Sequence, residues 1–189
     1  MAFTARSQPA RDAVLAAARR AFAAQGIERA TVRAIAADAG VDPSMVIRYF
    51  GSKDGLFEAA TTIDLALPDL AQVPASDRGA TLARRFVDLW DDPTTGEVLT
   101  LLLRAAPTSE RAADRIRDVF AVQVLGMLLR LDGTDDDEAA TRRRAGVLGS
   151  VILGTALSRY VLRLPPMAAA SADEVAESLA PVLQGVLGG

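Results

Sequence analysis

Two side chains near the N-terminus are placed where they could bind phosphate. Lys53 follows Ser52, a typical first residue of a helix, and therefore lies in the first helical turn. A cation there interacts unfavourably with the helix dipole, at a cost of about 0.3–1 kcal/mol. However, the cation and the free backbone N–H groups of the first turn can bind the same anion. Thr31 begins another predicted helix and could bind phosphate in the same way. Lys53 is the only lysine among 21 basic residues, although a solvated surface lysine is the alternative interpretation.

The elements that would position these groups form a helix-turn-helix pattern over residues 31–50. The first short helix offers small residues for close packing, and Gly40 lies where the backbone must reverse. Asp42 is a candidate N-cap, and Pro43 suits the first position of the second helix. The second helix would bury Val46 and Phe50. It would expose a face able to reach base edges, made of Ser44, Met45, Arg48 and Tyr49. A plain helical hairpin without a DNA role is the alternative.

Helical periodicity continues through the rest of the chain, and strand signals are nearly absent. The spacing of apolar residues, caps, Gly and Pro predicts an all-α protein of about nine helices. The predicted helices span residues 8–25, 31–39, 42–50, 52–67, 77–90, 96–106, 109–131, 135–164 and 171–187. The fourth, about 24 Å long at 1.5 Å per residue, would link two domains. Ser171 and Glu174 form a capping box for the last helix.

Composition excludes several function classes. The 189 residues contain neither Cys nor His, which excludes disulfides, thiol nucleophiles, His-dependent catalysis and imidazole metal sites. The longest apolar stretch, 145–157, is shorter than the roughly 20 residues needed to span a bilayer. No signal peptide is evident, so we expect a cytoplasmic protein. Residues 1–60 carry eight basic and six acidic groups, whereas the whole chain has a formal charge of −3. A slightly basic head on an acidic body is compatible with phosphate binding.

Residues 11–57 resemble the DNA-binding domain of the TetR family of bacterial transcriptional regulators. The resemblance rests on Phe22 with Gly26 and on the stretches 31–36 (TVRAIA), 39–41 (AGV) and 49–56 (YFGSKDGL). It implies an N-terminal helix-turn-helix DNA-binding domain, residues 1–55. Residues 56–189 would form a helical ligand-binding and dimerisation domain. The family is typified by homodimeric repressors that leave a palindromic operator when a small molecule binds.

By position, the resemblance implies that Thr31 and Lys53 grip phosphates and that Arg33 lies near the DNA backbone. Ser44, Met45, Arg48 and Tyr49 would face the major groove. Three departures from the family pattern bear on the contacts and the target sequence. Ile47 stands where the family usually has Tyr, Asp42 replaces the usual Ser cap, and Gly51 replaces a common Pro.

The C-terminal part offers candidates for a dimer surface and a ligand pocket. Small and apolar residues mix over 146–156, and the dimer surface is predicted at Leu148, Val151, Ile152 and Thr155. Core packing within one subunit is an equal alternative. An apolar ligand could be lined by Phe86, Trp90, Leu102, Phe120 and Met127, although such residues at helical spacing are more often simply core. Arg104, Arg159 and Tyr160 are possible polar anchors.

The sequence therefore favours a repressor of double-stranded DNA that acts as a homodimer and responds to a small, apolar ligand. No cofactor, metal or membrane partner is expected. One alternative is a helical adaptor that has lost DNA binding. An all-α enzyme is a weaker one, because the chain has no G-x-G-x-x-G or Walker sequence and no evident acid–base pair.

Overall fold

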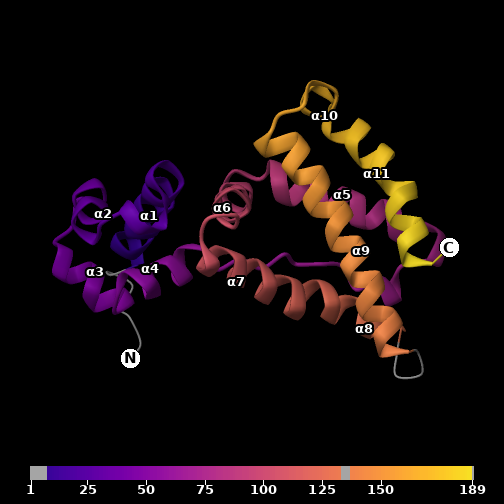
Figure 1. Ribbon diagram of the computed structural model, residues 1–189, viewed down its shortest axis with the longest axis horizontal. Helices are drawn as coiled ribbons and strands as arrows, with labels where there is room; N and C mark the ends of the chain where they lie inside the picture. Colours follow the sequence, from indigo (N-terminus) through magenta and orange to yellow (C-terminus); the bar gives the residue numbers. More distant parts are fainter. Residues whose placement is uncertain (1–7, 133–136, 189) are drawn as a thin grey trace.

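The computed structural model of the chain describes residues 8–132 and 137–188, and these residues form helices and connecting segments without strands. They build a small N-terminal head (residues 8–60), an extended strap (residues 61–69) and a larger helical body (residues 70–188) (Figure 1). The head contains α1 (Gln8–Arg29), α2 (Val32–Asp38), α3 (Pro43–Phe50) and α4 (Lys53–Ala60). The body contains α5 (Arg78–Asp91), α6 (Pro93–Ala105), α7 (Glu110–Val119), α8 (Gly126–Asp132), α9 (Glu138–Ala156), α10 (Pro165–Ala169) and α11 (Ala172–Leu187).

The head is held by a closely packed core between α1 and the three short helices. Phe22 of α1 and Phe57 of α4 meet edge to face with ring centroids 5.4 Å apart, and each is about 1% exposed. Ile35 of α2 and Val46 of α3 are fully buried beside them. The expected first helix does not stop at Gly26. It continues to Arg29 across a kink at that glycine, whose φ of 78° is a conformation that favours glycine.

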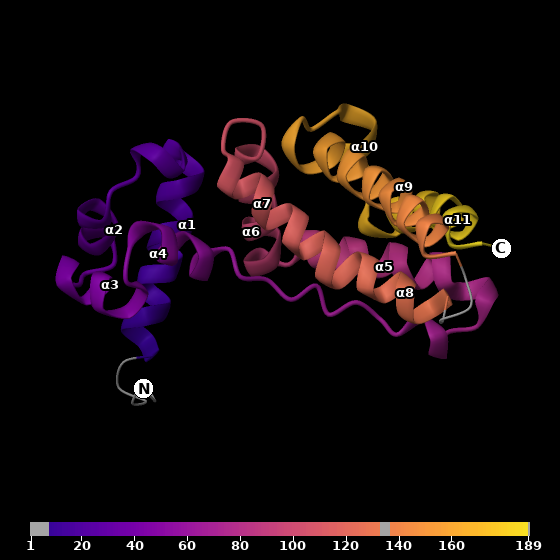
Figure 2. The same ribbon diagram turned by 60° about the horizontal axis from the view of Figure 1, so that its bottom comes forward.

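The fourth helix is shorter than the sequence predicts: α4 ends at Ala60 rather than near Leu67. The hydroxyls of Thr61 and Thr62 donate to the carbonyl oxygens of Phe57 and Glu58, each at 2.8 Å. Such bonds compete with helix continuation, and the β-branched run Thr61-Thr62-Ile63 also disfavours a helix. The strap that follows is extended and runs alongside α7 and α8 (Figure 2).

The body is built around α5, which packs along α11, and α6 packs against α1 of the head. The rod of α7 and α8 leads away from the head, and α8 contacts α9 at its far end (Figure 1). The helix expected over 109–131 is one rod whose middle, η3 (Phe120–Leu125), is π-helical. Two short 3₁₀ turns, η1 (Leu70–Gln72) and η2 (Ala75–Asp77), lead into α5. In the part of the chain that the structure describes, no helix is long and apolar enough to cross a membrane.

Helix boundaries in the second half of the body differ from expectation in two places. The start of the predicted helix 135–164 lies outside the described residues. Its visible part, α9, passes into the π-helical segment η4 (Leu157–Val161) and ends before Leu164. Pro165 and Pro166 do not terminate it; they occupy the first turn of α10, which suits their fixed φ. The capping box of Ser171 and Glu174 at the start of α11 is confirmed.

Candidate DNA-binding site and ligand cavity

Local chemistry fixes each end of the helix-turn-helix. The Thr31 hydroxyl accepts a hydrogen bond from the Ala34 N–H at 3.2 Å and begins α2. Gly40 takes a φ of 68° in the turn, a conformation that favours glycine. The Asp42 carboxylate accepts from the Ser44 N–H at 2.8 Å and begins α3. Gly51, with a φ of 75°, ends α3, and the Ser52 hydroxyl accepts from Gly55 at the start of α4.

The outward face of α3 carries Ser44, Ile47 and Arg48, which are all exposed. Met45 and Tyr49 are half-buried at its rim, and the Arg48 guanidinium lies 5.4 Å from the Tyr49 ring centre. Ile47 is 46% exposed and was not among the predicted DNA contacts. Its signal in the sequence was the i+3 spacing from Ser44, which puts both residues on one helix face.

Thr31 and Lys53, the predicted phosphate ligands, and Arg33, predicted near the DNA backbone, lie in different environments. Thr31 and Arg33 are exposed at the start of α2, and the Thr31 hydroxyl keeps its own hydrogen for a further acceptor. Lys53 is half-buried, and its Nζ donates to the carbonyl oxygens of Ile27 and Glu28, each at 3.0 Å. It therefore joins the start of α4 to the C-terminal end of α1, where unpaired carbonyls favour a cation. One of its three N–H groups is left for a phosphate.

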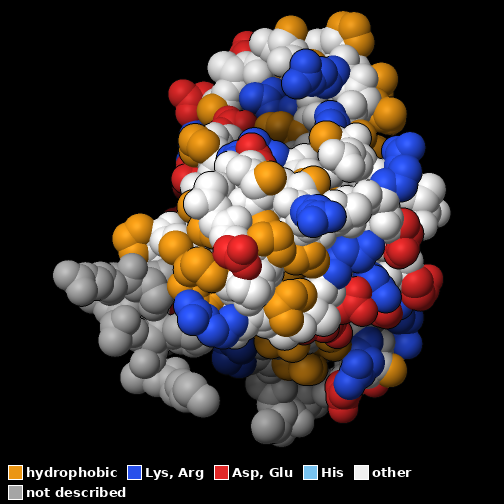
Figure 3. Space-filling model, turned by 90° about the vertical axis from the view of Figure 1, so that its left-hand side faces the viewer, with side chains coloured by type: hydrophobic (Ala, Val, Ile, Leu, Met, Phe, Trp, Pro, Cys, Tyr) orange, Lys and Arg blue, Asp and Glu red, His pale blue; other side chains and the backbone are white. Residues whose placement is uncertain are grey.

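The charge on the head is mixed rather than uniformly positive. Figure 3 views the molecule from the side of the head and shows Lys and Arg side chains separated by hydrophobic and uncharged ones. Asp42 is fully exposed, and the hydrogen bonds from Ser44 hold the pKa of its carboxyl below the usual value. Asp42 is therefore ionised at neutral pH and would repel a nearby phosphate. Among the described residues, no cluster of three or more acids is placed to hold a metal.

The sequence comparisons decide the family. Residues 14–60 match the family described as bacterial regulatory proteins, tetR family. Residues 77–187, more than half of the chain, match the family described as tetracyclin repressor-like, C-terminal domain. The chain belongs to the TetR family. It is thus a DNA-binding transcriptional regulator and not an enzyme, as predicted.

Several solved structures share the fold over nearly the whole chain. A TetR-family regulator from Streptomyces coelicolor A3 is 28% identical, covers 99% of both chains and has a TM-score of 0.66. NalD from Pseudomonas aeruginosa, the secondary repressor of the MexAB-OprM multidrug efflux pump, is 22% identical, with coverage of 94% and 95% and a TM-score of 0.71. GusR from Salmonella enterica is 19% identical, with 95% coverage of both chains and a TM-score of 0.67. A comparison with curated protein sequences gave no match.

The body of this TetR-family chain encloses a cavity of about 120 Å³. Apolar side chains of α5, α6, α7, η3, α8 and α9 form its walls, and the strap contributes Leu65 and Leu67. All five residues predicted to line a ligand pocket lie around it: Phe86, Trp90, Leu102, Phe120 and Met127. Whether they bind a ligand stays a prediction.

The predicted polar anchors do not line this cavity. Arg104 is exposed on α6 and faces the C-terminal end of α1. Arg159 donates to the carbonyl oxygens of Met167 at 2.6 Å and Ala170 at 2.7 Å, which fixes α10. Tyr160 stacks on Trp90 and donates to Asp91 at 2.8 Å. Burial, together with the hydrogen bond to Asp91, raises the pKa of Tyr160 to about 12.

Two of the four predicted dimer residues face inward instead of outward. Leu148 is 1% exposed, and Leu148 and Ile152 both line the cavity. Val151 and Thr155 are half-buried. The outer face of α9 carries other residues, Val147, Ser150 and Gly154, and Leu157 at the start of η4 continues it at spacings of three and four. Because α9 is apolar nearly all round, its sequence does not reveal which face is covered, and the dimer surface stays a prediction.

Head and body are joined by ion pairs and hydrogen bonds that the sequence did not indicate. Arg111 of α7 lies 2.5 Å from a carboxylate oxygen of Asp54 on α4 and 4.0 Å from one of Glu28 on α1. Arg115 of α7 lies 3.5 Å from the Thr61 carbonyl oxygen, just after α4 ends. These contacts connect residues far apart in the chain, and no local motif marks them.

Proposed function

We propose that this TetR-family chain is a cytoplasmic, homodimeric repressor. It binds a palindromic operator through α3 and is released when a small apolar molecule occupies the body. The observation that carries the proposal is the outward face of α3. An exposed Ser44, Ile47 and Arg48 stand on a short helix whose opposite side, at Val46, is fully buried. Such a helix can enter a major groove without unfolding the head.

The side chains of that face suit the reading of bases. Arginine makes bidentate hydrogen bonds to guanine, and a serine hydroxyl can hydrogen-bond to either base of a base pair. An apolar side chain contacts the thymine methyl group. Thr31, Arg33 and the remaining N–H of Lys53 are proposed to bind phosphates and to set the register. Met45 and Tyr49 are proposed to contact the rim of the groove.

We also propose that α9 and α11 form the dimer surface, on exposed residues that partly replace the predicted set. Val147 is 52% exposed and Val182 of α11 is 48% exposed. A Cβ added at Gly146, Gly154 or Gly185 would have no neighbour within 4 Å, so a partner helix could approach closely. Two heads related by a twofold axis would match half-sites about one helical turn apart or a multiple of it.

The division between head and body is proposed at the end of α4 instead of after residue 55. Leu56, Phe57 and Ala60 are buried in the same core as α1. The head would then end where the strap begins.

Selection of bound duplexes from random and genomic pools tests DNA recognition. The purified, ligand-free protein is mixed with the pools at about 0.15 M salt, where non-specific binding is weakened, and the bound DNA is sequenced. An enriched palindrome supports a dimeric, sequence-specific regulator. An unenriched pool from folded, dimeric protein would favour the alternative, a helical adaptor that has lost DNA binding.

The dimer surface is tested with two matched valine substitutions. Val147→Asp places a charge on the proposed surface, whereas Val122→Asp places one on η3, where Val122 is 72% exposed. We expect Val147→Asp to shift the protein to monomer in analytical ultracentrifugation and Val122→Asp to leave the dimer intact. Equal behaviour of the two variants would contradict this surface.

A further inference from the structure

The strap that carries the head is also a wall of the cavity. Leu65 and Leu67 line the cavity from the strap, together with helical walls that include Phe120 and Val124 of η3. The other walls are helices, whose backbone hydrogen bonds are internal. Residues 62–68 of the strap make no backbone–backbone hydrogen bonds with the described residues, and Ala66 takes a φ of 41°, a conformation that a residue with a Cβ rarely adopts. The strap is therefore the wall that yields most easily when the cavity is filled.

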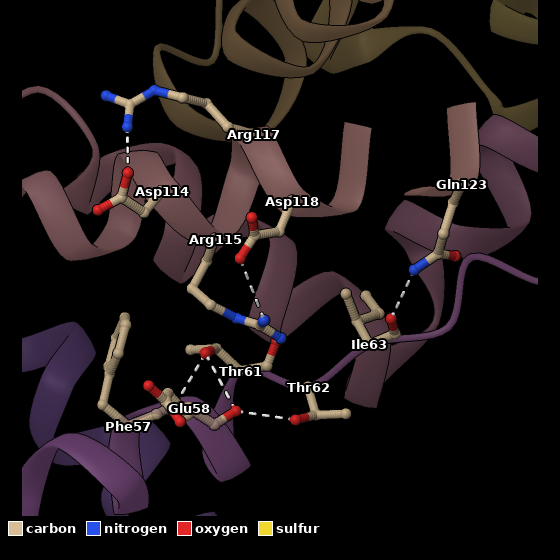
Figure 4. Close-up of polar contacts among 10 residues, drawn as sticks. All are labelled: Phe57, Glu58, Thr61, Thr62, Ile63, Asp114, Arg115, Arg117, Asp118 and Gln123. Atoms are coloured by element: carbon tan, nitrogen blue, oxygen red, sulfur yellow. Dashed lines mark hydrogen bonds and ion pairs between the residues drawn. The ribbon is translucent and has the colours of Figure 1, made fainter. Parts of the chain in front are cut away.

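Side chains of the body hold the strap in place by hydrogen bonds to its backbone. Gln123 of η3 binds two points: its Oε1 accepts from the Leu65 N–H at 2.7 Å, and its Nε2 donates to the Ile63 carbonyl oxygen at 2.9 Å. Figure 4 shows the second of these bonds beside the end of α4. Arg85 donates to the Leu65 carbonyl oxygen at 2.8 Å, and Arg115 lies 3.5 Å from that of Thr61. Because Gln123 and the lining residues Phe120 and Val124 share η3, one element touches both the cavity and the strap.

The lining restricts the chemistry of an occupant. Its side chains are leucine, isoleucine, valine, methionine and aromatic residues, with no carboxylate, guanidinium, hydroxyl or amide among them. Apart from the indole N–H of Trp90, the lining offers a polar group of a ligand no hydrogen-bond partner in place of water, and water itself needs two to four polar partners. In another protein, an engineered apolar cavity of about 150 Å³ stays dry and binds benzene. At about 120 Å³, this cavity must expand slightly to take a substituted benzene.

We propose that the effector is a compact, uncharged, hydrocarbon-like molecule that binds in the cavity against the strap. Gln123 is the positioning residue: its hydrogen bonds to the strap weaken when the cavity is occupied. The inference rests on the proposed function, because it specifies the ligand and the coupling of the same repressor. The expansion would push Leu65 and Leu67 outward. The strap would then release the head from its fixed position on the body.

Toluene, with benzyl alcohol and benzoate as polar and charged analogues of the same ring, tests the ligand class. We expect toluene to raise the Tm of the protein, since a ligand that binds only the folded state stabilises it. Benzyl alcohol should raise Tm less, and benzoate should leave it unchanged. Equal or stronger stabilisation by benzoate, or no response to toluene, would overturn the assignment of an apolar ligand.

Hydrogen exchange across the strap tests the role of Gln123. In the wild type, toluene should speed exchange of the Leu65 amide by about two- to tenfold, the range expected for loss of one hydrogen bond. Gln123→Ala should already exchange at the faster rate, still gain Tm with toluene, and show no further acceleration in the strap. Gln123→Glu keeps an acceptor for Leu65 but loses the donor to Ile63, and it should lie between the two.

The chain offers a matched control for the glutamine. Gln184 of α11 makes the same two-point contact elsewhere in the body: its Oε1 accepts from the Gly79 N–H at 2.8 Å and its Nε2 donates to the Ala75 carbonyl oxygen at 2.9 Å. Gln184→Ala should leave the strap and its response to toluene as in the wild type. If Gln123→Ala and Gln184→Ala responded alike, the coupling role of Gln123 would be wrong. Neither experiment uses DNA, so failure of the operator selection would count against the proposed function alone.

Discussion

The head and the body are both helical, yet they use their interiors differently. In the head, Phe22, Ile35, Val46, Leu56 and Phe57 are each 1% exposed or less, and short capped helices fix the outward face of α3. In the body, large apolar side chains surround a cavity of about 120 Å³. A closely packed domain resists changes of shape, whereas a cavity allows a small rearrangement. The difference suggests that the head keeps a constant DNA-binding surface while the body responds.

The largest expected effect comes from removing one phenylalanine from each region. Phe22→Ala should destabilise the head by about 3–5 kcal/mol, because it leaves a cavity in a full core. Phe120→Ala should cost less than about half of that, since part of the ring already faces empty volume. Denaturant unfolding monitored by circular dichroism measures both. Equal losses would show that the body is packed as tightly as the head.

A smaller effect is expected from one arginine on the DNA-binding face. Arg48→Ala should weaken binding to the selected duplex by about 1–3 kcal/mol and relax the preference at one base pair. Arg130→Ala removes an exposed arginine of α8 on the body and serves as the control, with affinity unchanged. Fluorescence anisotropy at fixed salt gives both affinities. A uniform loss across all duplexes for Arg48→Ala would instead indicate a phosphate contact.

Two glycines of the body separate cavity filling from helix propensity. A Cβ at Gly149 would lie 2.8 Å from Cε2 of Phe120, so Gly149→Ala should push that ring toward the cavity and abolish the toluene-induced rise in Tm. At Gly126 the nearest neighbour of an added Cβ is the flexible end of Arg130 at 3.5 Å. Gly126→Ala should therefore raise stability by up to about 1 kcal/mol and keep the response to toluene. Retained binding in Gly149→Ala would place the ligand elsewhere.

The smallest effect concerns the charge on the N-cap of α3. Asp42→Asn keeps a good N-cap but removes an anion near the DNA, so duplex affinity should rise slightly. The pKa of Asp42 is lowered in the folded protein, so its charge contributes stability above the unfolded pKa near 4. That contribution is lost as pH falls through the folded pKa. Thermal unfolding from pH 7 to pH 3 should show the difference between wild type and Asp42→Asn shrinking toward acid.

Local features of the head could be predicted from the sequence because their causes lie within a few residues. The caps at Thr31, Asp42 and Ser52 and the turn glycine Gly40 each act over one helical turn. The capping box of α11 is of the same kind. The five predicted lining residues also gather around one cavity, because the inward face of each helix follows from its periodicity.

The strap and the outward face of α9 could not be predicted because they depend on residues far away in the sequence. The predicted helix through Leu67 is prevented partly by the local run Thr61-Thr62-Ile63 and partly by Gln123, about 60 residues away, which binds the Leu65 N–H and the Ile63 carbonyl oxygen. On α9, apolar residues occur on all sides, so the cavity-lining Leu148 and the exposed Val147 are alike in sequence. The side of such a helix that faces the core depends on its neighbours.

The most direct test of the account is the affinity for the selected palindromic duplex with and without toluene, measured by fluorescence anisotropy at about 0.15 M salt with benzoate as the control. We expect two subunits per duplex and a fall in affinity of about 5- to 150-fold with toluene, the usual range of coupling between two sites. Benzoate should change nothing. An affinity that toluene leaves unchanged, in protein whose Tm toluene raises, would contradict the coupling of cavity and DNA-binding head.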